Sequence, residues 1–285
     1  MTAILLVAVG VLLVTTAPRV LSALPGLRRS PRAALLLWQT TALVGTLSVI
    51  AAGPVAAVSI WPLDRRGLDV AAALVALAAS GLCLSMLLVN AHLVGTALRS
   101  ARRRHDALLR LVGDDRREGR LTIVEHHTPT AYCVPGRRRR VVLSTATLAQ
   151  LPPEELEAVL AHERAHLGER HDLLLEYFTV AHQTAPRWLR SARALSEVRL
   201  LAAVLAARAA RHGAREVPLA RALVRLAGSR TPEAMLGAAD KRHVAARMHL
   251  LATEPASRWH ATGVYALVAL VALLPVSVLG LTMWG

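Results

Sequence analysis

The residues with the clearest chemical potential lie within one HExxH motif, as His162, Glu163 and His166. In a helix, residues four positions apart point from the same face, so both imidazoles can bind one metal ion. Imidazole nitrogens bind Zn²⁺ at about 2.0–2.1 Å, and two of them fit within one tetrahedral site. Glu163 is turned about 100° from His162 around a helix, where it can accept a proton from a water molecule at the metal. The spacing therefore predicts a Zn²⁺ centre with a general base.

The sequence around the motif predicts the helix that this spacing requires. The segment 152–171 opens with two prolines and two glutamates, which suit the first turn of a helix. Leu156, Val159 and Leu160 then recur at helical spacing. The alternative is a solvated helix surface on which the motif residues are simple acid–base neighbours. The apolar character of the segment favours the zinc site. The other candidate histidine ligands are expected to be surface or helix-capping residues: His126, His127, His171, His182 and His212.

Two short segments upstream of this helix, 121–125 and 140–144, are expected to be strands. The stretch 130–136 between them ends in a Pro-Gly turn signal. A strand beside the HExxH helix would offer an open edge to an extended peptide, although an ordinary small sheet is equally compatible with the sequence. Cys133 is expected to be a reduced thiol, because the sequence offers it no partner ligands.

Four apolar segments indicate a membrane protein, at 3–17, 33–60, 70–97 and 261–284. A helix needs about 20 apolar residues to cross the hydrocarbon core, a length that all but the first segment reach. The first segment lacks the preceding positive charge of a signal peptide, so it is expected to remain as a helix with its N-terminus outside. With 54% hydrophobic and 19% charged residues, the chain is neither an ordinary soluble domain nor one that lies wholly in lipid.

The arginines indicate the expected topology. They follow the first and third apolar segments, whereas the loop between the second and third is neutral. The positive-inside rule then places three transmembrane helices in 1–97, a cytoplasmic domain in 98–258 and a transmembrane helix in 259–285, with both termini outside the plasma membrane. The net charge of +15 fits this bias and attraction to the anionic lipid bilayer. Nucleic-acid binding is not expected, because only 3% of the residues are aromatic.

The stretches AYCVPG at 131–136 and EAVLAHERAHL at 157–167, with three helices before the domain and one after, resemble the BlaR/MecR-type antirepressor family of integral-membrane metallopeptidases. The HtpX-type membrane proteases are the nearest alternative family. The resemblance implies a gluzincin-like fold, Zn²⁺, and cytoplasmic proteolysis of a DNA-binding repressor or another regulatory protein. An external penicillin-binding sensor is not expected, and neither is a β-lactam trigger.

The same resemblance implies a third zinc ligand, a Glu on a later helix with an Asp four residues on. The helix expected at 191–212 has Ala203 and Ala207 at the corresponding positions. Its only acid is Glu197, which is predicted to be the third ligand after a register shift. Alternatively, Glu197 pairs with Arg193 on an exposed face. Two protein ligands alone would make a weak zinc site.

Together these features predict a mainly α membrane protein with four transmembrane helices and an α+β zincin-like domain between the third and the fourth. The predicted function is a zinc-dependent endopeptidase held in the membrane, with zinc on His162, His166 and Glu197 and with Glu163 as the general base. The alternative is a catalytically degenerate protein that serves as a membrane scaffold in signalling.

Overall fold

A computed structural model gives the fold. It describes residues 1–60, 67–116, 120–136, 139–187, 190–210, 216–226, 236–237, 246, 249–250 and 257–283. The chain forms two compact units, each made of stretches that are not consecutive. The helical unit comprises Met1–His92, Phe178–Val198 and Pro255–Gly285. The sheet unit comprises Leu93–Tyr177 and Arg199–Glu254. The division predicted from the sequence, at 1–97, 98–258 and 259–285, stays a prediction.

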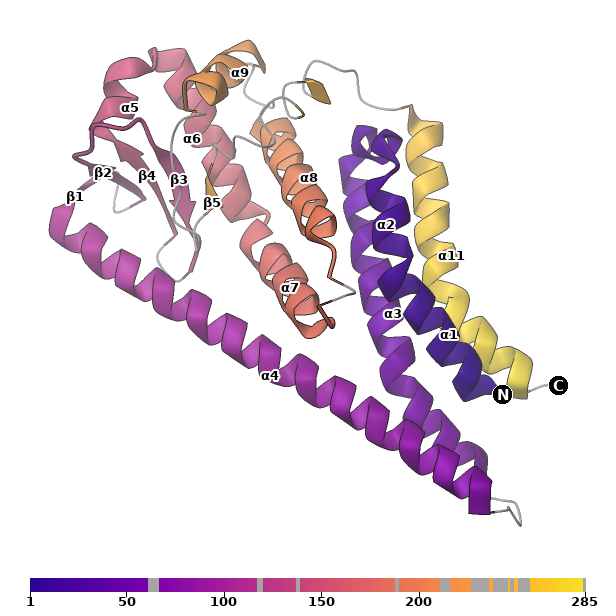
Figure 1. Cartoon of the computed structure of the whole chain (residues 1–285). Coiled ribbons are helices and arrows are strands. Elements are labelled where there is room, and N and C mark those ends of the chain that lie inside the picture. The colour runs from indigo at the N-terminus through magenta and orange to yellow at the C-terminus, as the bar shows by residue number, and fades with distance from the viewer. Residues whose placement is uncertain are drawn as a thin grey trace. The chain divides into compact units, whose positions relative to one another are not determined.

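The helical unit is built around long apolar helices. Its elements are α1 (Thr2–Thr15), α2 (Ala17–Ser22), the 3₁₀ helix η1 (Pro25–Arg29), α3 (Pro31–Ile60), α11 (Arg258–Met283) and parts of α4 (Gly67–Val112), α7 (His171–Thr184) and α8 (Ala192–Ala210). Helices α1, α3 and α11 lie side by side, and the start of α1 and the end of α11 lie at the same end of this unit (Figure 1).

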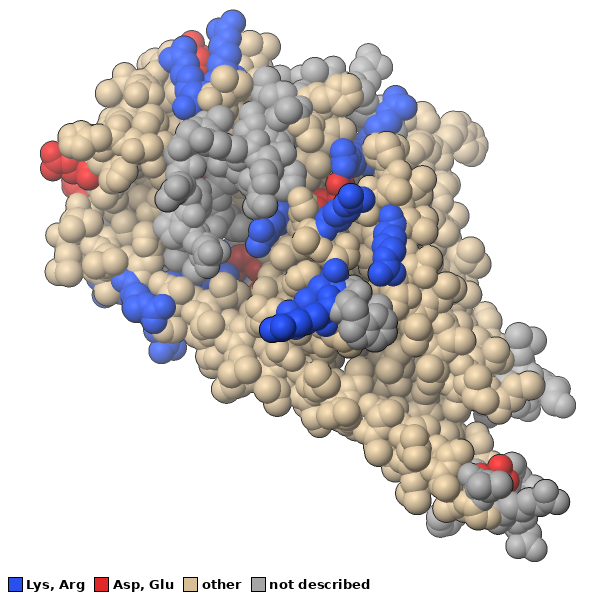
Figure 2. All heavy atoms as spheres, in the orientation of Figure 1, with Lys and Arg blue, Asp and Glu red and all other residues tan. Residues whose placement is uncertain are grey.

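Within the described residues, four helices are long and apolar enough to cross a membrane, and they correspond to the four predicted segments. They are Thr2–Ser22, Pro31–Ser59, Asp69–Val112 and Arg258–Gly280. Figure 2 shows an uncharged surface along most of α11, in which Arg258 at the first position is the only charged residue. The neutral loop predicted before α4 falls largely on residues 61–66, which lie outside the described residues.

Small and polar side chains set the helix contacts in the helical unit. A Cβ atom on Gly10 of α1 would lie 2.9 Å from the carbonyl oxygen of Gly45 on α3, so the two backbones approach closely there. Around Pro54, which removes a backbone donor from α3, the hydroxyl of Ser80 on α4 meets the backbone. Ser80 Oγ accepts from the Gly53 N–H at 2.9 Å and donates to the Val49 carbonyl at 3.1 Å.

Helix α4 does not end near residue 97, where the predicted third segment stops, but continues to Val112. The continuation is charged and amphipathic. Arg110 pairs with Asp106 at 2.7 Å one turn away, while Leu109 packs with Tyr132 and Val142 of the sheet unit. Hydropathy detects where the apolar segment ends, but a helix continues as long as its polar turns are satisfied and one face is buried.

The sheet unit contains a small mixed sheet and the helix that bears the HExxH motif. Its strands are β1 (Gly113–Arg116), β2 (Leu121–Val124), β3 (Ala131–Val134), β4 (Arg140–Ser144) and β5 (Leu236–Gly237), and its helices include α5 (Thr145–Gln150), α6 (Pro153–Gly168) and α9 (Glu216–Arg225). The order is β1-β2-β4-β3-β5, with β2 and β4 parallel and the other pairs antiparallel. Strands β2 and β4 confirm the two predicted strands. The mainly helical fold with a small α+β part is also confirmed.

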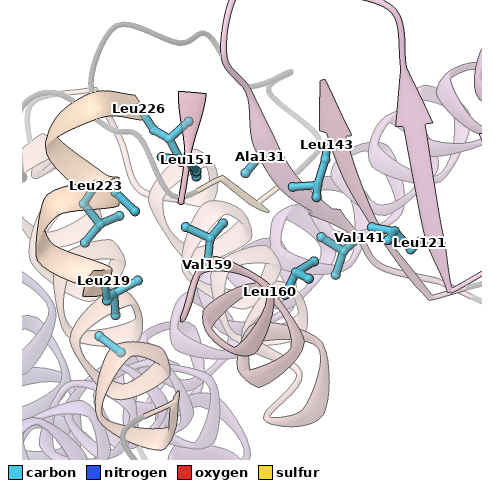
Figure 3. Close-up of a cluster of buried hydrophobic side chains, with 12 residues drawn as sticks. Leu121, Ala131, Val141, Leu143, Leu151, Val159, Leu160, Leu219, Leu223 and Leu226 are labelled. Carbon is cyan, nitrogen blue, oxygen red and sulfur yellow. The ribbon is translucent and has the colours of Figure 1, made fainter. Parts of the chain in front are cut away.

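The core of the sheet unit holds α6 between the sheet and α9. Val159 and Leu160 of α6 point into a cluster of buried side chains that the strands and α9 complete (Figure 3). The strands contribute Leu121, Ala131, Val141 and Leu143, and α9 contributes Leu219, Ala222 and Leu223. Burying each large aliphatic side chain stabilises the fold by about 1.5–3 kcal/mol. The apolar face predicted for this helix is therefore the face that fixes it in the fold.

Candidate metal centre

Charged and polar contacts fix the start of α6, ahead of the motif. Glu155, in its first turn, is only 2% exposed. Arg225 of α9 places its Nε atom 3.4 Å from Glu155 Oε2 and donates from Nη1 to the Gln150 carbonyl at 2.7 Å. An acid in the first turn also interacts favourably with the helix dipole. The helix therefore starts at a defined position, and this sets the direction in which the motif residues point.

The structure brings the two predicted histidine ligands together on one face of α6. His162 is fully buried, and His166 is 4% exposed. Their ring centroids lie 4.9 Å apart with the planes at 87°, so the edge of one ring faces the other. Glu163 between them is also fully buried. Two adjacent imidazoles and a carboxylate held away from bulk solvent are the donor and base types of a zinc hydrolase centre.

Cys133 of β3 lies beside the predicted general base. The Glu163 charge acts on the Cys133 thiol, and Cys133 is fully buried. Burial, and next the Glu163 charge, raise the pKa of Cys133 well above its usual range, so the sulfur stays protonated. Metal binding needs a thiolate, and Cys133 is a free thiol as expected. The sequence did not reveal this contact, because it depends on which face of β3 packs on α6.

The edge of β3 next to Cys133 is covered by β5. Cys133 pairs with Leu236 and Tyr132 with Gly237, in an antiparallel register. An open edge of β3 for an extended peptide is therefore not present at these two positions. The pattern matches the alternative of an ordinary small sheet beside the helix.

His171 was predicted to lie on the surface or at a helix cap, and its burial shows that the surface position is wrong. It is the first residue of α7, but it is only 3% exposed and packs against His166, with ring centroids 4.9 Å apart. Burial lowers the pKa of His171, and the neighbouring Glu169 carboxylate opposes that shift. His126 and His127 are exposed, as expected, and His212 lies outside the described residues.

Glu197 belongs to the helical unit, where its carboxylate is bound by an arginine. Arg28 of η1 donates from Nε to Glu197 Oε2 at 2.9 Å and from Nη2 to Oε1. This partner differs from Arg193, the alternative that the helical spacing suggests. Among the described residues, no three or more His, Cys, Asp or Glu side chains gather closely enough to hold a metal ion. Glu197 as a zinc ligand therefore stays a prediction.

The two alanines of α8 that replace the expected acids are both buried. Ala203 is 8% exposed, and Ala207 is fully buried. Ala207 belongs to the same core cluster as Val159 and Leu160 of α6. This part of α8 thus contributes apolar packing to the core around α6, and at these two positions it offers no carboxylate.

The comparison with protein families identifies the chain. A sequence model of Peptidase family M48 matches residues 98–262, which include all of α6. The chain belongs to peptidase family M48. Members of this family are in general zinc metallopeptidases, and the predicted resemblance is thereby confirmed at the level of the family. Neither the search of curated proteins nor the search of solved structures gave a match.

Proposed function

We propose that this M48 protein is a membrane-embedded, zinc-dependent endopeptidase whose active centre lies on α6. One observation carries the proposal: His162, Glu163 and His166 are buried together on a helix that the core fixes, inside the segment that matches the family. Burial matters because charge interactions strengthen where water is excluded.

The residues present divide the catalytic work as follows. His162 and His166 hold the zinc ion, which when bound polarises the scissile carbonyl and makes water more acidic. The Glu163 carboxylate accepts the proton of the attacking water and returns it to the leaving amine. Because Glu163 is fully buried on a helix that the core fixes, it needs little reorganisation to accept the proton.

Glu197 completes the zinc site in this proposal only when its ion pair with Arg28 is open, because a carboxylate held by two guanidinium hydrogen bonds is already engaged. The second candidate function, a catalytically degenerate scaffold, is favoured by the same contact. Ala203 and Ala207 favour it as well, since they stand where the expected acids would be. Both candidates share the membrane-embedded architecture.

The proposed setting is the plasma membrane, with the catalytic unit on the cytoplasmic side and both termini outside. The four apolar helices support a multi-pass protein. The arginines that follow the first and third apolar segments support the orientation. The common position of the start of α1 and the end of α11 in Figure 1 agrees with termini on one side. On this side of the membrane, the proposed substrate is a DNA-binding repressor or another regulatory protein.

Degradation of fluorescently labelled casein by the zinc-loaded, detergent-purified full chain tests the endopeptidase. The wild type is expected to release dye-labelled fragments, and Glu163→Gln is expected to keep its zinc while losing at least about a hundredfold in rate. Equal rates for the two proteins contradict the assigned base. A zinc-loaded wild type that releases nothing favours the degenerate scaffold.

A further inference from the structure

The turn between α6 and α7 brings a third imidazole against the zinc-binding pair. Helix α6 ends at Gly168 and α7 begins at His171, so only Glu169 and Arg170 connect them. Arg170 has φ of 52°, a left-handed conformation that costs a non-glycine residue about 1–2 kcal/mol. Strain of this kind persists where the surroundings over-determine the backbone, and it clusters at functional sites. At this turn, the left-handed conformation of Arg170 brings His171 into contact with His166.

The protons in this contact can be assigned from the two distances. His171 Nδ1 lies 3.0 Å from His166 Nδ1, so one of the two nitrogens carries the shared proton. His171 Nε2 lies 3.1 Å from Glu169 Oε2, and a carboxylate oxygen can only accept. For neutral rings, His171 therefore carries its proton on Nε2 and accepts at Nδ1. His166 then donates from Nδ1, and its Nε2 carries no proton.

We propose that His171 is a positioning residue for the zinc centre. By accepting the Nδ1 proton of His166, it fixes the tautomer and the ring orientation in which His166 Nε2 binds the metal. Glu169 fixes His171 in the same way. This inference rests on the proposed function, since it assigns a role beside a zinc ligand. Histidine ligands generally donate their second N–H to such a partner, and removal of that partner typically weakens metal binding by 10–100-fold.

The geometry favours positioning over direct ligation by His171. Both of its ring nitrogens are engaged, one by His166 and one by Glu169. A third-ligand role would have to break at least one of these contacts. The turn supports positioning as well. Arg170, in its left-handed conformation, places His171 next to Nδ1 of His166, the ring nitrogen that is not proposed to bind the metal.

The test measures the zinc dissociation constant of the detergent-purified full chain by competition with a chromogenic chelator. Asn places an oxygen where the His Nδ1 atom stands, and Gln places one where Nε2 stands. His171→Asn is therefore expected to stay within about threefold of the wild type, and His171→Gln and His171→Leu to lose about 10–100-fold. The exposed His127 supplies the control, since His127→Leu is expected to change nothing. Thermal unfolding of the metal-free proteins reports whether each variant folds.

Three results overturn the inference, and only one of them also overturns the proposed function. If His171→Leu binds zinc as the wild type does, positioning is wrong and the proposed function stands. If His171→Asn loses as much as His171→Leu, the nitrogen itself is needed and His171 is a ligand or a packing residue. If the wild type binds no zinc at all, the proposed function fails and the inference fails with it. If His171→Leu does not fold, the zinc affinities of His171→Asn and His171→Gln are compared with each other instead.

Discussion

Replacing Arg28 by alanine is expected to destabilise the helical unit by about 1–3 kcal/mol, because the Glu197 carboxylate loses both of its guanidinium donors. The two side chains are 28% and 16% exposed. The pair thus lies between an exposed ion pair, which contributes about 0–1 kcal/mol, and a buried one, whose disruption costs about 3–5 kcal/mol. The double variant Arg28→Ala/Glu197→Ala is expected to lose less than the sum of the two single variants, by about 1–2 kcal/mol.

Unfolding in mixed detergent micelles, followed by tryptophan fluorescence to which the buried Trp38 of the same unit contributes, measures these changes. Arg19 is the matched control, because its guanidinium donates to the Thr15 carbonyl one turn away, on the surface. Arg19→Ala is expected to stay within about 0.5 kcal/mol of the wild type. A coupling energy near zero, with Arg28→Ala no worse than Arg19→Ala, would refute the reasoning.

Three further changes test the packing and the acid–base contacts. Leu143→Ala, at a fully buried position of the core against α6, is expected to lower the free energy of unfolding by about 2–5 kcal/mol, measured by thermal or denaturant unfolding; a loss below 1 kcal/mol would contradict the burial. Ser80→Ala is expected to destabilise by about 1–3 kcal/mol because the Gly53 N–H loses its acceptor, and an unchanged midpoint would mean that the hydroxyl is dispensable. Because its pKa is raised in the fold, Cys133 is expected to react with iodoacetamide more slowly at alkaline pH than a free thiol, as followed by mass spectrometry. The same shift makes the folded state bind more protons, so stability is lost as pH rises through the ordinary range of a thiol, and a stability that rises there would contradict the assignment.

The parts of the site that the sequence revealed are those set by local spacing. His162 and His166 share one face because a helix repeats every 3.6 residues, and the apolar face at Val159 and Leu160 marks the side on which the helix packs. Strands β2 and β4 were likewise visible from short runs of β-branched residues. Local patterns of this kind persist in the folded chain because burying their apolar faces in the core stabilises the fold.

The parts that the sequence concealed depend on contacts or backbone angles that no local pattern encodes. Glu197 meets Arg28, which is 169 positions away along the chain, whereas the sequence only suggested a partner one turn away. His171 reaches His166 because Arg170 adopts a left-handed conformation, and an arginine does not indicate that conformation in a sequence. Both surprises concern which residues surround the predicted metal ligands.

The zinc content of the purified chain tests the central claim most directly. The protein is purified gently in detergent with zinc present, and bound metal is measured by mass spectrometry in the wild type and in His166→Ala. Zinc held by the His162–His166 pair on α6 predicts about one zinc per wild-type chain and less than a tenth of that in His166→Ala. A metal-free wild type, or zinc fully retained by His166→Ala, would contradict it.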